Sequence, residues 1–124
     1  MSTDQPMRPD AITVVSETAA PGVAVIRPRG DVDTATVARL RGEFAERVAA
    51  GDRHVVLDLS GVEFLGSAGL ALLVEQREAA VGRDAVLCLA AVPRAVARPL
   101  KITGLQELFD TYDDVDAAVA ELTG

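Results

Sequence analysis

Short apolar runs along the chain predict its β-strands. Four runs are separated by polar or turn residues: 12–15, 23–27, 54–59 and 85–90. The first two flank the turn pair Pro21–Gly22, and this spacing predicts an antiparallel hairpin in which Gly30 closes the second strand. The third run is rich in β-branched residues, which is typical of a central strand in a parallel sheet.

Apolar residues at helical spacing predict three helices. The first begins at a capping residue, Asp33 or Thr34, and ends near Ala50, with an inward face of Val37, Leu40, Phe44 and Val48. The second begins at a capping Ser67 and ends at Gly82, with an inward face of Leu70, Leu73, Val74 and Val81. The last is capped by Asp113 or Asp114, with an inward face of Val115, Ala118, Val119 and Leu122.

Two prolines interrupt the pattern between the fourth strand and the last helix. Pro93 suits the first turn of a helix, but proline inside a helix costs about 3 kcal/mol. Because Pro99 follows after six residues, we expect a broken or very short third helix that ends by Gly104. Leu108 and Phe109 are expected to form a short edge strand.

Strands that alternate with helices predict an α/β fold. We expect a single domain over residues 11–124, with a mainly parallel mixed sheet of four to five strands, an N-terminal hairpin and about four covering helices. Residues 1–10 contain two prolines and few large apolar side chains. This composition predicts a disordered N-terminal tail.

Composition and charge narrow the classes of function. The chain has 124 residues and a formal charge of −7, from 12 Lys and Arg against 19 Asp and Glu, so nucleic acid is not an expected partner. Its single cysteine, Cys88, excludes an intramolecular disulfide and a cysteine-based metal cage. The start lacks the apolar core of a signal peptide, and the longest apolar stretch, 64–74, is too short to span a bilayer. A soluble cytoplasmic protein without a membrane partner is expected.

The common catalytic and phosphate-binding motifs are missing. The only histidine, His54, starts a strand, whereas ligand sites of parallel sheets lie at the carboxyl ends. The sequence around Ser67 lacks the first glycine of the Gly-x-Ser-x-Gly hydrolase motif, and no P-loop is present. Asp31 and Asp33 could contact a metal, but a helix cap at Asp33 is the simpler interpretation. We therefore expect no catalytic residue, no metal and no cofactor.

Ser67 allows two interpretations. It could be only a helix cap, since helices often begin with serine. Its neighbours Gly66, Ala68 and Gly69 have almost no side chain, so its hydroxyl could also enter the active site of another protein. A helix N-terminus would tolerate a phosphate there. Spacing alone does not choose between these interpretations.

Three motifs, in order, resemble the STAS domain family, and specifically the bacterial anti-sigma factor antagonists. Residues 58–70, Asp-Leu-Ser-Gly-Val-Glu-Phe-Leu-Gly-Ser-Ala-Gly-Leu, resemble the signature D-x-S-x-V-x-F-x-D-S-x-G-L. Residues 30–33, Gly-Asp-Val-Asp, resemble its G-x-[ILV]-D motif. Residues 103–105, Thr-Gly-Leu, with Phe109 resemble its S/T-G-L…F ending. The resemblance covers about residues 11–124.

The resemblance implies a partner switch. An antagonist of this kind binds an anti-sigma factor that is also a GHKL-type serine kinase, and a sigma factor is thereby released. The kinase phosphorylates the serine that falls on Ser67, phosphorylation ends the binding, and a PP2C-type phosphatase restores it. The expected role is regulation of transcription, for example in a stress response, by a monomer or weak dimer. The expected partner-binding residues are Asp31, Asp33, Thr34, Gly66, Ser67, Ala68, Gly69 and Leu70.

Two departures from the family pattern bear on this switch. Gly66 stands where the family has aspartate before the serine, and Ala68 replaces a second Ser or Thr. Ala68 leaves Ser67 as the obvious phosphate acceptor. Gly66 keeps two alternatives open. One is a STAS domain without a phosphorylation switch, acting as a constitutive binder, a scaffold subunit or part of a lipid-transport complex. The other is a sensor of a small ligand such as a nucleotide.

Overall fold

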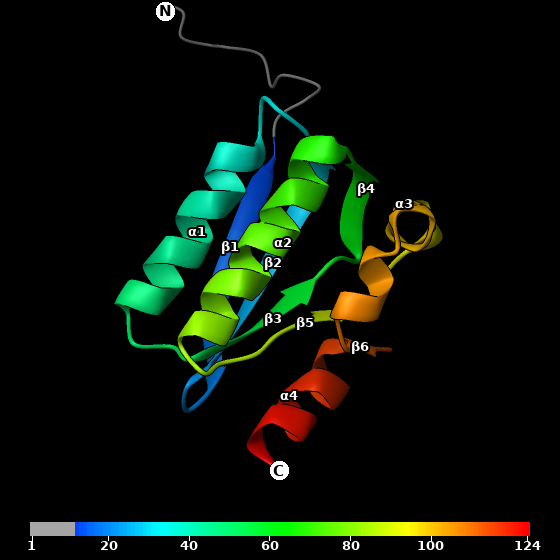
Figure 1. The fold of residues 1–124 in the computed structure, drawn as a ribbon. Coiled ribbons are helices and arrows are strands. Elements are labelled where there is room, and N and C mark those ends of the chain that lie inside the picture. Colours follow the sequence, from blue (N-terminus) through cyan, green and yellow to red (C-terminus); the bar gives the residue numbers. More distant parts are fainter. Residues whose placement is uncertain (1–11) are drawn as a thin grey trace, which may run out of the picture.

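A mixed β-sheet forms the centre of the structure, a computed structural model that describes residues 12–124 (Figure 1). The tail predicted at residues 1–10 lies outside the described residues. Within them the sheet has six strands rather than four to five: β1 (Thr13–Ala20), β2 (Val23–Val32), β3 (His54–Asp58), β4 (Gly61–Leu65), β5 (Leu87–Ala90) and β6 (Thr111–Tyr112). The strand order is β1-β2-β3-β5-β6, and β4 pairs with β2.

The predicted N-terminal hairpin is present, and its strands are longer than the apolar runs. β1 pairs antiparallel with β2, whereas β3, β4, β5 and β6 join the sheet by parallel pairing. β1 continues to Ala20 and β2 to Val32. Ladder hydrogen bonds extend each strand through residues whose polar side chains face outward, so apolar runs underestimate strand length.

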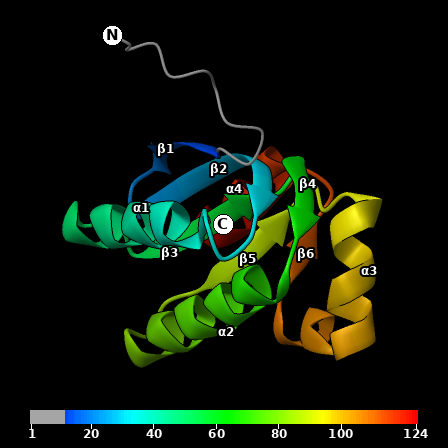
Figure 2. The ribbon, with the colours of Figure 1, turned by 90° about the horizontal axis from the view of Figure 1, so that it is seen from above.

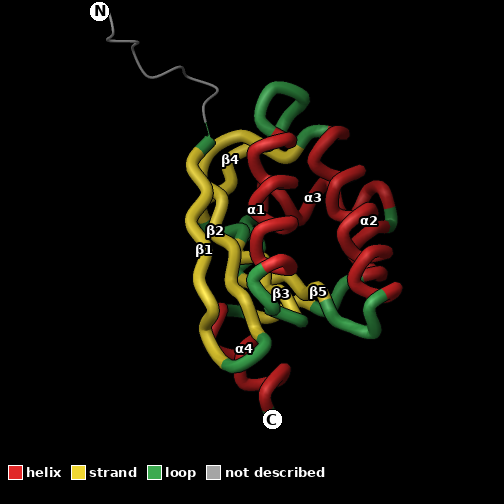
Figure 3. The backbone as a smooth tube through the Cα atoms, turned by 90° about the vertical axis from the view of Figure 1, so that its left-hand side faces the viewer, coloured by secondary structure: helices red, strands yellow, loops and turns green. Residues whose placement is uncertain are grey.

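Four helices accompany the sheet in the described part of the chain, as the sequence predicts. They are α1 (Val37–Ala49), α2 (Ser67–Gly82), α3 (Arg94–Thr103) and α4 (Val115–Thr123), with a 3₁₀ turn, η1 (Leu105–Leu108), after α3. Figure 3 shows α1 and α2 together on one side of the strands. α4 packs on the opposite face, and α3 lies alongside β4 (Figure 2).

The helices divide the core into two clusters. The larger lies between the sheet and α1, α2 and α3, and includes Ile26, Leu40, Leu57, Leu72, Leu89 and Leu100. The smaller lies under α4 and includes Val25, Val56, Cys88 and Ala118. The last helix begins as predicted, because the Asp114 carboxylate caps it by accepting a hydrogen bond from the Ala117 N–H at 2.8 Å. β2, β3 and β5 are buried on both faces, which explains their continuous apolar sequences.

The third helix corrects a prediction. α3 runs unbroken for 10 residues through Pro99. Two inward side chains, Val96 and Leu100, are buried in the larger cluster, and their burial offsets the hydrogen bond that proline cannot donate. Gly104, with φ of 77°, ends the helix where predicted.

The edge strand predicted at Leu108 and Phe109 is also wrong. Leu108 closes the turn η1, and Phe109 turns inward to be buried. The strand that pairs with β5 is Thr111–Tyr112 instead. The apolar character of residues 108 and 109 therefore reflects a buried anchor rather than a strand.

Two details of the first and second helices differ from expectation. α1 begins at Val37 after Thr36, not after Asp33 or Thr34. In α2, Val81 is exposed and Ala80 is buried in its place. Leu73 and Ala80 are seven residues apart and share one face, whereas each single residue turns the helix by about 100°. Val81 is thus turned away from the stripe that faces the sheet.

Candidate functional site

Ser67 is the first residue of α2 and is exposed at the end of the molecule where β4 finishes (Figure 1). Gly66, not Ser67, is the N-cap residue, and the Ser67 hydroxyl makes no capping hydrogen bond. The helix begins this early because the Gly66 carbonyl accepts a hydrogen bond from the Leu70 N–H at 3.0 Å. The predicted serine cap is therefore wrong, and the hydroxyl is left for other contacts.

The loop after β2 lies beside this helix start. β2 and β4 are parallel neighbours in which Asp31 pairs with Phe64 and Val32 pairs with Leu65. The Gly66 N–H then donates to the Val32 carbonyl at 2.9 Å. The two predicted segments, 31–34 and 66–70, are thus brought together at one end of the sheet.

Asp33 has a structural task within that loop. Its carboxylate Oδ1 accepts hydrogen bonds from the N–H groups of Ala35 at 2.9 Å and Thr36 at 3.1 Å. These bonds form a turn before α1 rather than the helix cap that the sequence predicts. Asp31 is half-buried, and Thr34 is exposed.

Thr36 anchors the same loop and was not singled out from the sequence. It is buried, its hydroxyl donates to the Asp31 carbonyl at 2.7 Å, and the hydroxyl accepts from the Asp33 N–H at 3.0 Å. No sequence signal separates this threonine from Thr34, which is only two residues away. Its bonds fix the position of Asp31 and Asp33 relative to Ser67.

Two glycines set how closely α2 approaches the sheet. A Cβ on Gly69 would lie 2.5 Å from Leu65 Cδ1 and 2.9 Å from Val32 Cγ1. Gly69 is buried, so it lies beneath the surface that carries Ser67 and allows α2 to pack closely on Leu65 and Val32. A Cβ on Gly66 would lie 2.9 Å from Phe64 Cε2. A side chain at this position, where the family pattern has aspartate, would therefore require the exposed ring of Phe64 to move.

Phe64 is the clearest surface feature that sequence reasoning missed. Its side chain is 52% exposed beside Gly66, whereas Phe44 and Phe109 are buried. Aromatic side chains often dominate the binding energy of protein interfaces. The sequence pattern does not predict this exposure, because Glu63 and Phe64 are both exposed within β4. This breaks the usual alternation of buried and exposed side chains along a strand.

The remaining residues of the predicted surface flank Ser67. Ala68 is half-buried and small. Leu70 is half-buried and packs against the larger core cluster. Helix α2 has no acidic residue in its first turn, so its unpaired N–H groups and its dipole favour negative charge at this end. The surface therefore combines an exposed hydroxyl, an exposed aromatic ring and a helix start that accepts an anion.

Other titratable groups lie away from this surface. His54, at the opposite end of β3, accepts a hydrogen bond at Nδ1 from the Val86 N–H at 3.0 Å. Burial and the nearby Arg53 lower the pKa of His54. The Cys88 thiol is buried in the sheet, and burial raises its pKa to about 12. Within residues 12–124, no three His, Cys, Asp or Glu side chains are grouped closely enough to hold a metal ion.

Comparison with known proteins identifies the family. The sequence profile of the STAS domain matches residues 15–118. The chain belongs to the STAS domain family. Over 116 residues this STAS domain is 36% identical to the anti-sigma-F factor antagonist RsfB of Mycobacterium tuberculosis, a match that covers 94% of this chain and 93% of RsfB.

Solved structures give the same architecture. An anti-sigma factor antagonist from Mycobacterium paratuberculosis has a TM-score of 0.83 and 33% identity, over 94% of this chain and 98% of that one. The Bacillus cell fate determinant SpoIIAA, in its phosphorylated form, has a TM-score of 0.70 and 15% identity, over 88% of this chain and 98% of that one. The SpoIIAA likeness shows a shared fold. In the described part of this STAS domain, no helix has both the length and the apolar character needed to span a membrane.

Proposed function

We propose that this STAS domain is an anti-sigma factor antagonist whose binding is ended by phosphorylation of Ser67. It binds an anti-sigma factor that is also a GHKL-type serine kinase, and so releases a sigma factor. The observation that carries the proposal is the exposed Ser67 on the first residue of α2, between the small residues Gly66 and Ala68. The name and the nearly full-length similarity of RsfB support the same function.

Phosphorylation at this position is compatible with the folded domain. A phosphate on Ser67 would face the free N–H groups at the start of α2, where the helix dipole stabilises negative charge by about 0.3–1 kcal/mol. Because the hydroxyl makes no capping bond, the modification breaks no cap. Bacillus SpoIIAA keeps the same fold in its phosphorylated form.

The same phosphate is incompatible with a packed interface. It adds a charge of about −1.5 to −2 beside the exposed ring of Phe64, and a partner packed on this ring would have to remove that charge from water. Burying an unpaired charge costs several kcal/mol, and each 1.4 kcal/mol changes an affinity about tenfold. A large loss of affinity therefore needs no refolding of the antagonist.

A charge substitution tests the switch. We expect Ser67→Glu to weaken binding to the purified anti-sigma factor at least about tenfold in calorimetry, while Ser67→Ala binds within a few-fold of the natural chain. Ser60→Glu is the matched control, because Ser60 is an exposed serine before β4. Equal binding by Ser67→Glu would contradict the switch. A natural chain that binds no anti-sigma factor of its organism would contradict antagonism itself.

A kinase reaction tests the modification separately. Incubation with ATP and the bound anti-sigma factor should add one phosphate to the natural chain and none to Ser67→Ala, measured by intact mass. A PP2C-type phosphatase should remove that phosphate and restore the complex. A complex that forms but never accepts phosphate would instead favour a constitutive STAS binding module, since Gly66 replaces the family aspartate.

A further inference from the structure

A second surface lies at the other end of α2 from Ser67. A groove of about 270 Å³ opens between the last turns of α2, the start of β5 and the turn η1. Its lining includes three of the large apolar side chains that are exposed in the described chain, Val81 at 60%, Val86 at 38% and Leu108 at 39%. At about 1.5 Å per helical residue, Val81 lies about 21 Å along α2 from Ser67.

The floor of the groove includes the sheet edge at the start of β5, where Leu87 is 6% exposed and β6 does not pair with it. β6 pairs with β5 only at Leu89 and Ala90. On the β3 side of β5, the Val86 and Ala90 carbonyls accept from Val55 and Leu59. Because strand residues alternate their hydrogen-bonding direction, the peptide groups of Leu87 point to the other side, where β6 has not yet begun.

Arg77 keeps that edge open. The Leu89 N–H donates to the Asp110 carbonyl at 3.0 Å. If β6 continued in the same register toward its N-terminal side, the Leu108 carbonyl would lie opposite the Leu87 N–H. The Leu108 carbonyl instead accepts from Arg77 Nε at 2.8 Å, which ties η1 to α2 and leaves the groove between them.

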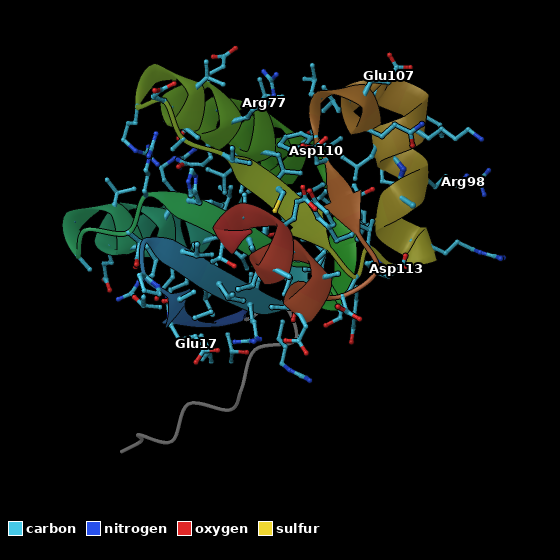
Figure 4. The ribbon with its side chains drawn as sticks, turned by 90° about the horizontal axis from the view of Figure 1, so that it is seen from below. Glu17, Arg77, Arg98, Glu107, Asp110 and Asp113 are labelled. Atoms are coloured by element: carbon cyan, nitrogen blue, oxygen red, sulfur yellow. The ribbon has the colours of Figure 1, made fainter. Side chains whose placement is uncertain are left out.

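Charge selects the kind of segment that fits. Two carboxylates, Glu107 and Asp110, line the groove together with one cation, Arg77, so the lining is acidic by one charge. Neither carboxylate forms a salt bridge within residues 12–124. In Figure 4, Asp110 lies beside Arg77, and Glu107 lies farther from it, on the turn η1. A second copy of this chain is a poor match, because its free edge strand β1 carries Glu17 and no basic residue.

We propose that this groove binds an extended segment of another protein as an added strand on β5. The peptide groups of Leu87 pair with the segment's backbone, as in other cases of strand addition. An apolar side chain of the segment lies among Val81, Val86 and Leu108, and a basic side chain reaches Glu107 or Asp110. The exposed edge is short, because the Ala85 N–H already bonds to the Ala80 carbonyl at 2.8 Å. Side-chain contacts therefore set most of the selectivity.

Amide exchange and peptide titration of the full ¹⁵N-labelled chain test the proposal. In the free chain, the Leu87 amide should exchange faster than the Cys88 amide, which faces β3. The probe is the acetylated and amidated peptide Lys-Val-Thr-Val-Lys. Adding it should shift the Val86 and Leu87 amide signals and slow exchange at Leu87. Val81→Asp should weaken this binding about tenfold, whereas Val15→Asp, at an equally exposed valine outside the groove, should not change it.

Several results would overturn the proposal. The same peptide with proline in place of threonine, which lacks one backbone N–H, should not bind, and equal binding would exclude strand addition. A peptide with glutamate in place of both lysines, Glu-Val-Thr-Val-Glu, should bind more weakly. If it binds as tightly as the lysine peptide, the groove does not select a basic segment. Leu87 protection that grows with protein concentration, without peptide, would assign the groove to a second copy. A Leu87 amide as protected as Cys88 in the dilute free chain would mean that the edge is not open.

Discussion

Gly66 and Gly69 both lie at the start of α2, yet their surroundings differ. The atom nearest to an added Cβ at Gly66 belongs to the exposed ring of Phe64, which can turn toward solvent. The atoms nearest to an added Cβ at Gly69 belong to Leu65 and Val32, which are buried. The same added methyl group therefore meets a soft neighbour in one case and a packed core in the other.

We expect Gly69→Ala to lower the free energy of unfolding by about 1–3 kcal/mol through overpacking. Gly66→Ala should lower it by less, about 0.5–1 kcal/mol, because alanine is a poorer N-cap residue than glycine and the exposed ring of Phe64 can move aside. Urea denaturation of both variants measures the difference. Equal losses for the two variants would mean that the ring of Phe64 is held as firmly as the core.

At the scale of elements, polar bonds connect the edge strand β1 to helix α1 and the turn after it. The Thr18 hydroxyl donates to Asp52 Oδ1 at 2.9 Å, and Arg47 Nη1 lies 3.4 Å from Asp52 Oδ2. The Ser16 hydroxyl donates to Glu43, and this bond is the main cause of the lowered pKa of Glu43. Asp52 is only 6% exposed, so its carboxylate oxygens are hydrogen-bonded by these partners in place of water.

Asp52→Ala is expected to cost about 3 kcal/mol of unfolding free energy, because it leaves the Arg47 guanidinium without its carboxylate in a part-buried position. The control is Glu75→Ala, which removes an exposed carboxylate of helix α2 that lies 2.9 Å from Arg41 Nε and should cost no more than about 1 kcal/mol. Denaturation midpoints of the two variants provide the comparison. A small loss for Asp52→Ala would show that the contacts of Asp52 with Thr18 and Arg47 contribute little to the stability of the fold.

Local sequence patterns predicted some elements and not others for a physical reason. Buried positions are occupied by apolar residues, so the sequence alone predicts β3, β5 and the inward face of α1. β4 and β6 owe their extended form to partners far along the chain, β2 and β5, and their own sequences carry little signal. At the candidate site, the motif located Ser67, but the exposure of Phe64 and the bonds of Thr36 depend on tertiary packing.

At the scale of the whole molecule, the two proposed surfaces lie at opposite ends of α2, so one partner at each could bind at the same time. His54 lies at the same end of the sheet as the groove, and its Nδ1 accepts from the Val86 N–H. That bond requires the unprotonated nitrogen. Protonation of His54 Nδ1 therefore breaks a hydrogen bond between the start of β3 and the residue before β5.

We expect the chain to lose stability as pH falls from 7.5 to 5.5. The pKa of His54 in the folded chain is lowered by burial and by Arg53, so the unfolded chain takes up the proton first. The stability contributed by neutral His54 is fully present above its pKa in the unfolded chain, near 6.5. It is lost as the pH falls toward its lower pKa in the folded chain. His54 is the only histidine, so urea denaturation of His54→Gln should show a weaker dependence over this range. An unchanged dependence would exclude His54 as the group responsible.

The reactivity of Cys88 can be used to measure how often the fold opens. It is the only thiol in the chain, it is fully buried in β5 between β3 and β6, and its pKa of about 12 leaves almost no thiolate at neutral pH. A thiol reagent can therefore react only when the packing of α4 over this face of the sheet opens, and the labelling rate reports the frequency of these openings. A cysteine introduced on the surface would be modified long before Cys88, so a dye placed near Ser67 needs no cysteine-free background.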